Sequence, residues 1–293
     1  MEIQWPLILF VAFCAASAGT FASQALLALK KENSAIQLPA LITSVVFLAI
    51  GGVAVLFHLA QPLHIFNGFG NPTSGITQEL VAIVVLAIIM VIYFVMIRQK
   101  DGEVPAWVAV LAVVFSVVLD VVCAHSYMMA SMPAWDSFLQ VLSVVGGSCA
   151  MGPAVVAAIA ALRGESVNFA GLLAVIGTAV ALVFTVAYVM DMSTVSGSLV
   201  AMNTTYIDPT NPTAPMFDAG AVAISSPEIM PAVVVSIVAS AAALIGAIIG
   251  KTKGNWKVWG VVVALCALVA ACALRVAFYG LGATVYSFYG ITG

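Results

Sequence analysis

Charged side chains are scarce in this sequence. Lysine, arginine, aspartate and glutamate make up 7% of the 293 residues, whereas hydrophobic residues make up 63%. Runs of about 20 apolar residues recur along the chain, and a water-soluble core cannot bury so much apolar surface. The net charge of -3 also leaves no basic stripe for nucleic acid. The composition therefore predicts an integral protein that crosses the membrane several times.

Cysteine pairs with the spacing of a metal or iron–sulfur site are also missing. No C-x-x-C motif occurs, and all the cysteines lie within apolar segments, which excludes a disulfide framework. We interpret these residues as small packing side chains. They are Cys14, Cys123, Cys149, Cys266 and Cys272.

Eight segments are long and apolar enough to cross a bilayer. Because lipid offers no partner to backbone N–H and C=O groups, we expect each to be a helix and the fold to be all-α. We expect two packed four-helix bundles in one membrane domain, residues 1–293. The first segment lacks a positively charged leader and is interpreted as a transmembrane helix. The predicted spans are roughly 6–29, 37–60, 79–98, 105–128, 137–162, 168–190, 229–250 and 256–280.

The loop cations are confined to alternate connections. They follow the first, third, fifth and seventh spans, and the remaining connections and both ends of the chain carry none. Because loop lysines and arginines stay in the cytoplasm, this pattern predicts that both termini are extracytoplasmic. The cations are Lys30, Lys31, Arg98, Lys100, Arg163, Lys251, Lys253 and Lys257.

One predicted outer connection, about 191–228, is much longer than the others. It is rich in Thr, Ser, Asn and Pro, and its DPTNPTAP run at 208–215 favours an ordered, turn-rich cap over a helix. Loops this long are usually functional or disordered. We therefore expect either a flexible cover or a docking surface.

Polar side chains gather near the predicted outer face. His58 and Glu79 bracket the connection after the second span, and His64 and Asn67 lie inside it. An ionisable residue at a membrane surface is a site hypothesis by default. A simpler interpretation of Glu79 is a helix N-terminal carboxylate that the helix dipole stabilises.

The fourth and eighth spans add further polar residues at similar depth. Asp120 and Tyr127 are seven residues apart and share a helical face, whereas His125 is turned away from both. Asp120 and Arg275 both fall in the outer half of the bilayer, so we predict that they form a structural ion pair. Tyr127 and Tyr279 have an alternative interpretation as part of an aromatic belt at the membrane surface.

This set of residues suits oxidation of a quinol, which releases two electrons and two protons. A histidine and a carboxylate can hydrogen-bond the quinol hydroxyls and accept the protons, and an apolar cleft can hold the ring. We expect His58 and Glu79 to be catalytic and no metal to be bound. The remaining expected quinol-binding residues are His64, Asn67, His125, Tyr127 and Arg275.

Several short motifs are similar to those of one known family. They are WPLILFVAFCAASAG at 5–19, HLAQPLHIFNGF at 58–69, the Gln78-Glu79 pair, YMMASMPAW at 127–135, MGP at 151–153 and RVAFYGLGATV at 275–285. Together they resemble the membrane-anchor subunit of dimethyl sulfoxide reductase and its relatives. The similarity touches most of the predicted spans, in order.

The resemblance implies an eight-helix anchor in a prokaryotic cytoplasmic membrane that oxidises menaquinol near the outer face. Electrons would pass to a four-cluster iron–sulfur subunit and then to a molybdenum bis-pterin catalytic subunit. These cofactors would belong to the partner subunits, and no haem is expected. The family's quinol-site histidine and glutamate fall on His58 and Glu79. His64 and His125 stand where arginine is expected, so a titratable group replaces a permanent charge.

Two other functions stay open from the sequence. An anchor with haem b would hold the haem between histidines of facing helices, but His58 and His125 make at most one such pair. A secondary transporter or channel would place polar groups near the midplane and interrupt its helices there. Asp120 and the stretch 146–153 are the only features of this kind, and small residues more often serve close helix packing. A Soret band would reveal the haem b anchor, and solute uptake into proteoliposomes would reveal the transporter or channel.

Overall fold

The computed structural model describes residues 3–32, 34–58, 70–99, 102–205 and 223–284, and these residues form helices and no strand. Eight of the helices are long and apolar enough to cross a membrane, which confirms the predicted fold class. A short 3₁₀ helix, Ser34–Ile36, leads into the second of them. Their bounds are α1 Trp5–Leu29, α2 Gln37–Leu56, α3 Gly75–Gln99, α4 Ala106–His125, α5 Phe138–Arg163, α6 Asn168–Thr205, α7 Met230–Lys253 and α8 Trp256–Gly280.

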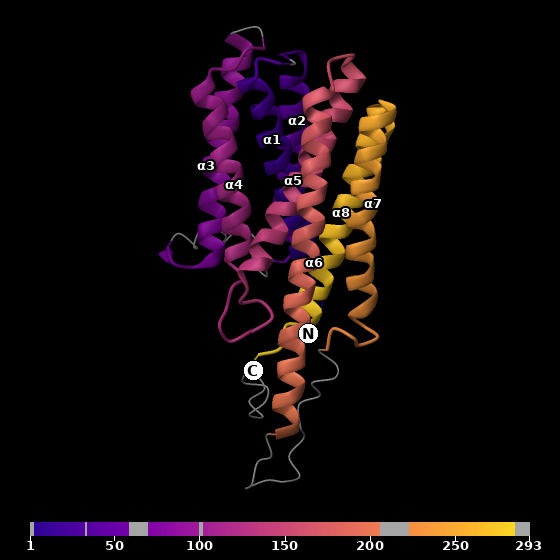
Figure 1. The fold of residues 1–293 in the computed structure, drawn as a ribbon. Coiled ribbons are helices and arrows are strands. Elements are labelled where there is room, and N and C mark those ends of the chain that lie inside the picture. The colour runs from indigo at the N-terminus through magenta and orange to yellow at the C-terminus, as the bar shows by residue number, and fades with distance from the viewer. Residues whose placement is uncertain (1–2, 33, 59–69, 100–101, 206–222, 285–293) are drawn as a thin grey trace.

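Helix α6 extends further than the sequence predicted. The connection expected to begin at Asp191 is helical up to Thr205, so the prediction is wrong over 191–205. Figure 1 shows this part of α6 running past the ends of the neighbouring helices. Residues 191–205 contain no proline and one glycine, so polar composition alone did not end the helix. The run at 208–215 lies outside the described residues.

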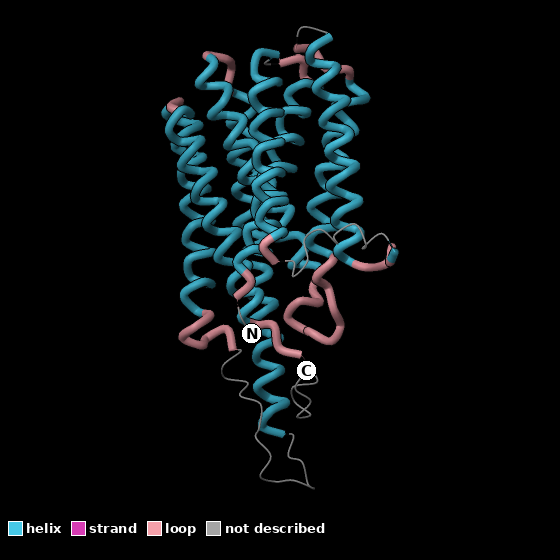
Figure 2. Tube along the Cα trace, turned by 180° about the vertical axis from the view of Figure 1, so that it is seen from behind, coloured by secondary structure: helices cyan, strands magenta, loops and turns pink. Residues whose placement is uncertain are grey.

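Both ends of the described chain lie at the same end of the helix bundle (Figure 2). We call this the terminus end, and the last residues of α2, α4 and α6 also lie there. The connections after α1, α3, α5 and α7 lie at the opposite end, which we call the cationic end. The described lysines and arginines in or next to those connections therefore gather at one end of the molecule.

Helices α1 and α5 lie at the centre of the bundle. Helix α1 packs against α2, α4 and α5, while α5 packs against α1, α4, α6 and α8. These two helices are also the most buried of the eight. The other main contacts join α3 to α4 and join α7 to α6 and α8. The expected pair of four-helix bundles stays a prediction.

Small residues let the central helices approach closely. A Cβ atom at Gly19 of α1 would lie 2.1 Å from the Ser148 carbonyl oxygen, and one at Gly177 of α6 would lie 1.8 Å from the Cys149 carbonyl oxygen. Pro153 lies inside α5 and has no N–H, so the Cys149 carbonyl lacks its usual helical donor. Glycine is required at both contacts, and backbone packing sets the spacing of α1, α5 and α6.

Candidate functional site

Glu79 lies near the start of α3 with its side chain buried. The hydroxyl of Ser126, the first residue after α4, donates a hydrogen bond to Glu79 Oε1. The same hydroxyl oxygen is 3.2 Å from the Cys123 carbonyl oxygen. Helices α3 and α4 are packed neighbours joined at the cationic end, so the start of α3 lies beside the end of α4. The fold thereby holds a carboxylate inside the protein at the terminus end.

Arg275 extends from α8 toward the same region and is only 6% exposed. Its guanidinium carbon lies 4.7 Å from the centre of the Phe278 ring and 5.4 Å from that of Tyr127. Aromatic faces of this kind stabilise a cation that has been removed from water. Arg275 also interacts electrostatically with Glu79, so the buried cation and carboxylate act on each other.

An aromatic frame holds Arg275 in place. Trp135 stacks on Phe278 with the ring centres 4.6 Å apart, and its Nε1–H donates to the Phe278 carbonyl oxygen at 2.7 Å. The Tyr127 ring meets Phe278 and Tyr279 edge-on, with centre distances of 6.0 and 6.4 Å. These contacts tie the connection after α4 to the end of α8. Because Tyr127 and Tyr279 are buried, the alternative of a surface aromatic belt is excluded for both.

The predicted ion pair between Asp120 and Arg275 is not formed in the structure. Within the described residues, Asp120 Oδ1 and both terminal nitrogens of Arg275 are buried without a hydrogen-bond partner. Asp120 lies beside Ser148 of α5. Helix α4 packs mainly on α1 and α3, whereas α8 packs mainly on α5 and α7. Similar depth does not bring two side chains together when their helices are not close neighbours.

The two histidines that the structure describes are both exposed. His58 follows α2, and His125 is the last residue of α4, so Tyr127 lies beyond the helix on which the sequence placed both. In the described part of the chain, neither side chain forms a hydrogen bond or ion pair with Glu79 or Arg275. His64 and Asn67 lie outside the described residues. Of the predicted site, the structure therefore brings together Glu79, Tyr127 and Arg275.

Sequence reasoning missed several contributors to this region. Ser126 lies between His125 and Tyr127, and Trp135 and Phe278 belong to motifs that carry the family resemblance, so the sequence holds a signal for all three. For Gln140 of α5, the only signal in the sequence is that it is a polar residue in an apolar span. Its Nε2 donates to the Ala124 carbonyl oxygen at 3.1 Å, and its Oε1 has no partner among the described residues.

We call the assembled residues the Arg275 cluster. It offers a carboxylate and a hydroxyl joined by a hydrogen bond, a cation with unused donors and aromatic walls. Such a group can bind a ligand that carries hydroxyls and can accept its proton. In the described ranges, no three His, Cys, Asp or Glu side chains are placed to hold a metal ion. The cluster consists of Glu79, Ser126, Tyr127, Trp135, Arg275, Phe278 and Tyr279.

Comparison with known proteins gives one family for this chain. The sequence model of the DMSO reductase anchor subunit (DmsC) matches residues 1–281, which is nearly the whole chain. A search of curated proteins finds no match. The matched region contains every residue of the Arg275 cluster.

Proposed function

Because the chain belongs to the DMSO reductase anchor subunit family, we propose that it oxidises menaquinol as the membrane subunit of a molybdopterin oxidoreductase complex. The observation that carries this proposal is the burial of Glu79 beside Ser126 within reach of the Arg275 charge. A carboxylate that is withheld from water and feels the charge of a nearby cation can take a proton from a bound hydroxyl. No other buried carboxylate of the described chain has such surroundings.

In the proposed reaction, Glu79 accepts one proton from the quinol head group. The hydrogen bond from Ser126 fixes the orientation of the carboxylate. Arg275 stabilises the negative charge that develops as the hydroxyl loses its proton, and the rings of Tyr127 and Phe278 keep that charge out of water. His58, exposed at the end of α2, is the proposed acceptor of the second proton, with His64 and Asn67 in the adjoining connection.

The electrons leave through partner subunits in this proposal. A four-cluster iron–sulfur subunit receives them at the terminus end and passes them to a catalytic subunit with molybdenum bis-pterin. The cations at the opposite end support a cytoplasmic position for that end, in a prokaryotic membrane, with the terminus end and its proposed quinol site facing outward. The extension of α6 beyond its neighbours adds surface for a partner at this end.

The site assignment is tested by Glu79→Gln in the purified complex. We expect quinol-dependent reduction to fall by about 10²- to 10⁴-fold, the usual contribution of a general base, because the amide cannot accept the proton. Reduction by a soluble dye that donates directly to the iron–sulfur subunit should be unchanged. Glu165→Gln, a half-buried carboxylate at the cationic end, is the matched control. Wild-type quinol turnover in Glu79→Gln would remove Glu79 from the site.

The proposed docking face is tested by cross-linking from single introduced cysteines. Asn71→Cys lies at the terminus end and Lys253→Cys at the cationic end, and both positions are exposed. The five native cysteines are buried or half-buried, which keeps their background low. We expect only the cysteine at 71 to capture the iron–sulfur subunit. Capture from 253 alone would reverse both the docking face and the sidedness.

A further inference from the structure

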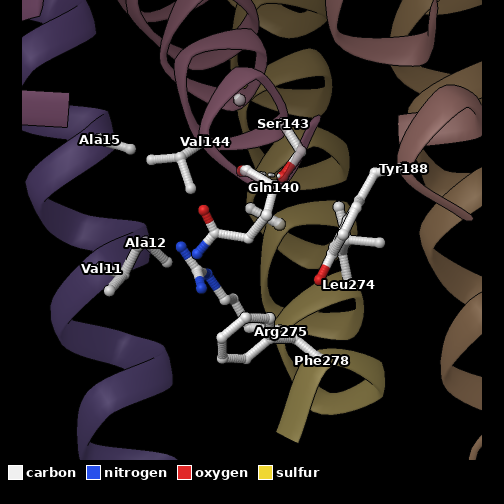
Figure 3. A pocket seen from close by; sticks show the side chains of 12 residues that line it. Val11, Ala12, Ala15, Gln140, Ser143, Val144, Tyr188, Leu274, Arg275 and Phe278 are labelled. Carbon is white, nitrogen blue, oxygen red and sulfur yellow. Dashed lines mark hydrogen bonds between the residues drawn. The ribbon is translucent and has the colours of Figure 1, made fainter. Parts of the chain in front are cut away.

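Two cavities at opposite ends of the bundle differ greatly in size. Figure 3 shows the smaller one, where Arg275 extends from α8 toward Gln140 of α5; its volume of about 20 Å³ is room for one water molecule. The larger one is a cleft at the cationic end, formed by the connections after α1 and α3. Its volume is about 540 Å³, within the range of sites that bind small molecules.

The walls of this cleft are held by the backbone at the ends of α1 and α3. Lys31, just after α1, has a left-handed backbone with φ 55°, and Gly102, just after α3, has φ 92°. Left-handed backbone is uncommon for a lysine, and strain of this kind gathers at functional sites. A Cβ atom at Gly102 would lie 2.9 Å from the Ser34 carbonyl oxygen, so the two connections touch directly. The two walls are therefore fixed relative to each other.

The buried part of the lining is Gln37, the first residue of α2, which is 1% exposed. Its Oε1 accepts a hydrogen bond of 2.8 Å from the Tyr93 hydroxyl, and its Nε2 donates to the Gln24 carbonyl oxygen at 3.2 Å. Tyr93 belongs to α3 and Gln24 to α1, so this one side chain ties three helices together. These bonds use one of the two Nε2 hydrogens, and the second can serve a ligand.

The cleft lies at the level of the lipid headgroups. Helices α1 and α3 end beside it, and α2 and α4 begin beside it, so it is at the edge of the apolar spans. The polar headgroups of a bilayer lie just outside the hydrocarbon that such helices cross. A ligand from the membrane would therefore present its headgroup to this cleft.

The charges on the lining suit a ligand that carries both signs. Among the described residues, the charged side chains of the cleft are one cation, Lys31, and two carboxylates, Glu32 and Glu103. Within this part of the chain, no ion pair joins Lys31 to either carboxylate. An ammonium has three N–H donors for carboxylate oxygens, and a lysine binds a phosphate as a point charge. An anionic headgroup without an ammonium would be repelled by the two carboxylates.

We propose that this cleft binds the headgroup of a phosphatidylethanolamine lipid, with the ammonium between Glu32 and Glu103 and the phosphate at Lys31. The site lies at the opposite end of the bundle from the Arg275 cluster, and it does not depend on the proposed quinol oxidation. Gln37 adds a neutral donor for the phosphate oxygens at the inner side of the cleft.

The test measures which lipid the purified complex binds. The complex is stripped of lipid in detergent and titrated with dimyristoyl lipids that differ only in their headgroups: phosphatidylethanolamine, phosphatidylcholine and phosphatidylglycerol. Native mass spectrometry gives the dissociation constant of the first lipid bound. Wild type should bind phosphatidylethanolamine about tenfold more tightly than the other two, because the choline group has no N–H and the glycerol group has no positive charge.

Two variants separate the two ends of the headgroup. In Glu32→Gln/Glu103→Gln, the preference for phosphatidylethanolamine over phosphatidylcholine should fall about tenfold, because each solvent-facing ion pair contributes a few-fold. Lys31→Gln removes a phosphate contact that both lipids share, so it should weaken both a few-fold and keep the preference. Glu165→Gln, at the same end but outside the cleft, is the control and should bind as wild type does.

The soluble compound O-phosphoethanolamine is the last comparison, because it has the same headgroup without acyl chains. It should bind at least about tenfold more weakly than the lipid, since the chains add apolar contact. Binding as tight as that of the lipid would assign the cleft to a soluble ligand and overturn the proposal. Equal affinity of wild type for the three lipids would also overturn it, as would a full preference in Glu32→Gln/Glu103→Gln.

Discussion

Two buried charges of this chain lie in opposite kinds of surroundings. Asp120 lies beside Ser148, whose backbone meets Gly19 of α1 so closely that no side chain fits between them. Arg275 lies among aromatic rings and borders a cavity. Both carry polar atoms without a partner among the described residues. The first region is tied to a close backbone contact that sets the spacing of the helices, whereas the second has donors, a bordering cavity and a carboxylate nearby.

The largest effect should come from adding one carbon in the close-packed region. Gly19→Ala places a Cβ 2.1 Å from the Ser148 carbonyl oxygen and 2.9 Å from its hydroxyl. The helices must separate, and we expect a loss on the order of 3 kcal/mol in the free energy of unfolding, the upper range for overpacking. Unfolding of the purified chain in mixed detergent micelles measures it.

Gly52→Ala in α2 is the control for this prediction. A Cβ atom at Gly52 meets nothing within 4 Å, and alanine is the better helix former, so stability should be unchanged or rise by about 0.5–1 kcal/mol. Equal stability of Gly19→Ala and Gly52→Ala would mean that backbone packing does not set the spacing of α1 and α5.

Because Asp120 and Arg275 lie in separate surroundings, the stability losses from replacing each of them should add. Arg275→Met removes the contacts of the cation with two aromatic faces, at a cost of about 2 kcal/mol. Because Asp120 and Arg275 form no ion pair, the loss in Asp120→Asn/Arg275→Met should equal the sum of the single losses within about 0.5 kcal/mol. If the double variant loses less stability than the sum of the two single losses, the two side chains do interact, as the sequence predicted.

The sequence predicted the helices well because their signal is local. Runs of apolar residues need no knowledge of neighbours, and the eight spans agree with the structure apart from α6, which continued through polar residues that do not break a helix. The Asp120–Arg275 prediction failed for the opposite reason. The depth of a residue in the membrane can be counted along its own span. Which helices touch, in contrast, depends on contacts between distant segments, such as that of Gly19 with Ser148.

The candidate site shows the same division. Glu79 and Arg275 could be chosen from the sequence because a charge in an apolar span is conspicuous. Gln140 could not, since its contact depends on how α5 packs against α4: its Nε2 donates to the Ala124 carbonyl oxygen. Ser126 likewise gains its meaning only from its hydrogen bond to Glu79.

The smallest effect should come from the frame around Arg275. The Phe278 carbonyl is among the last four of α8, which have no donor within the helix, and Trp135 Nε1–H supplies one. Trp135→Phe keeps an aromatic ring but removes this donor, so stability should fall by about 1 kcal/mol. Because Phe278 supports the guanidinium, the KM for quinol should rise a few-fold with reduction by a soluble dye unchanged. Trp107→Phe, exposed on α4, should change neither quantity. A Trp135→Phe variant with the wild-type KM would show that Arg275 keeps its position without the aromatic frame. The surroundings of Arg275 would then differ from those of Asp120 only by the bordering cavity.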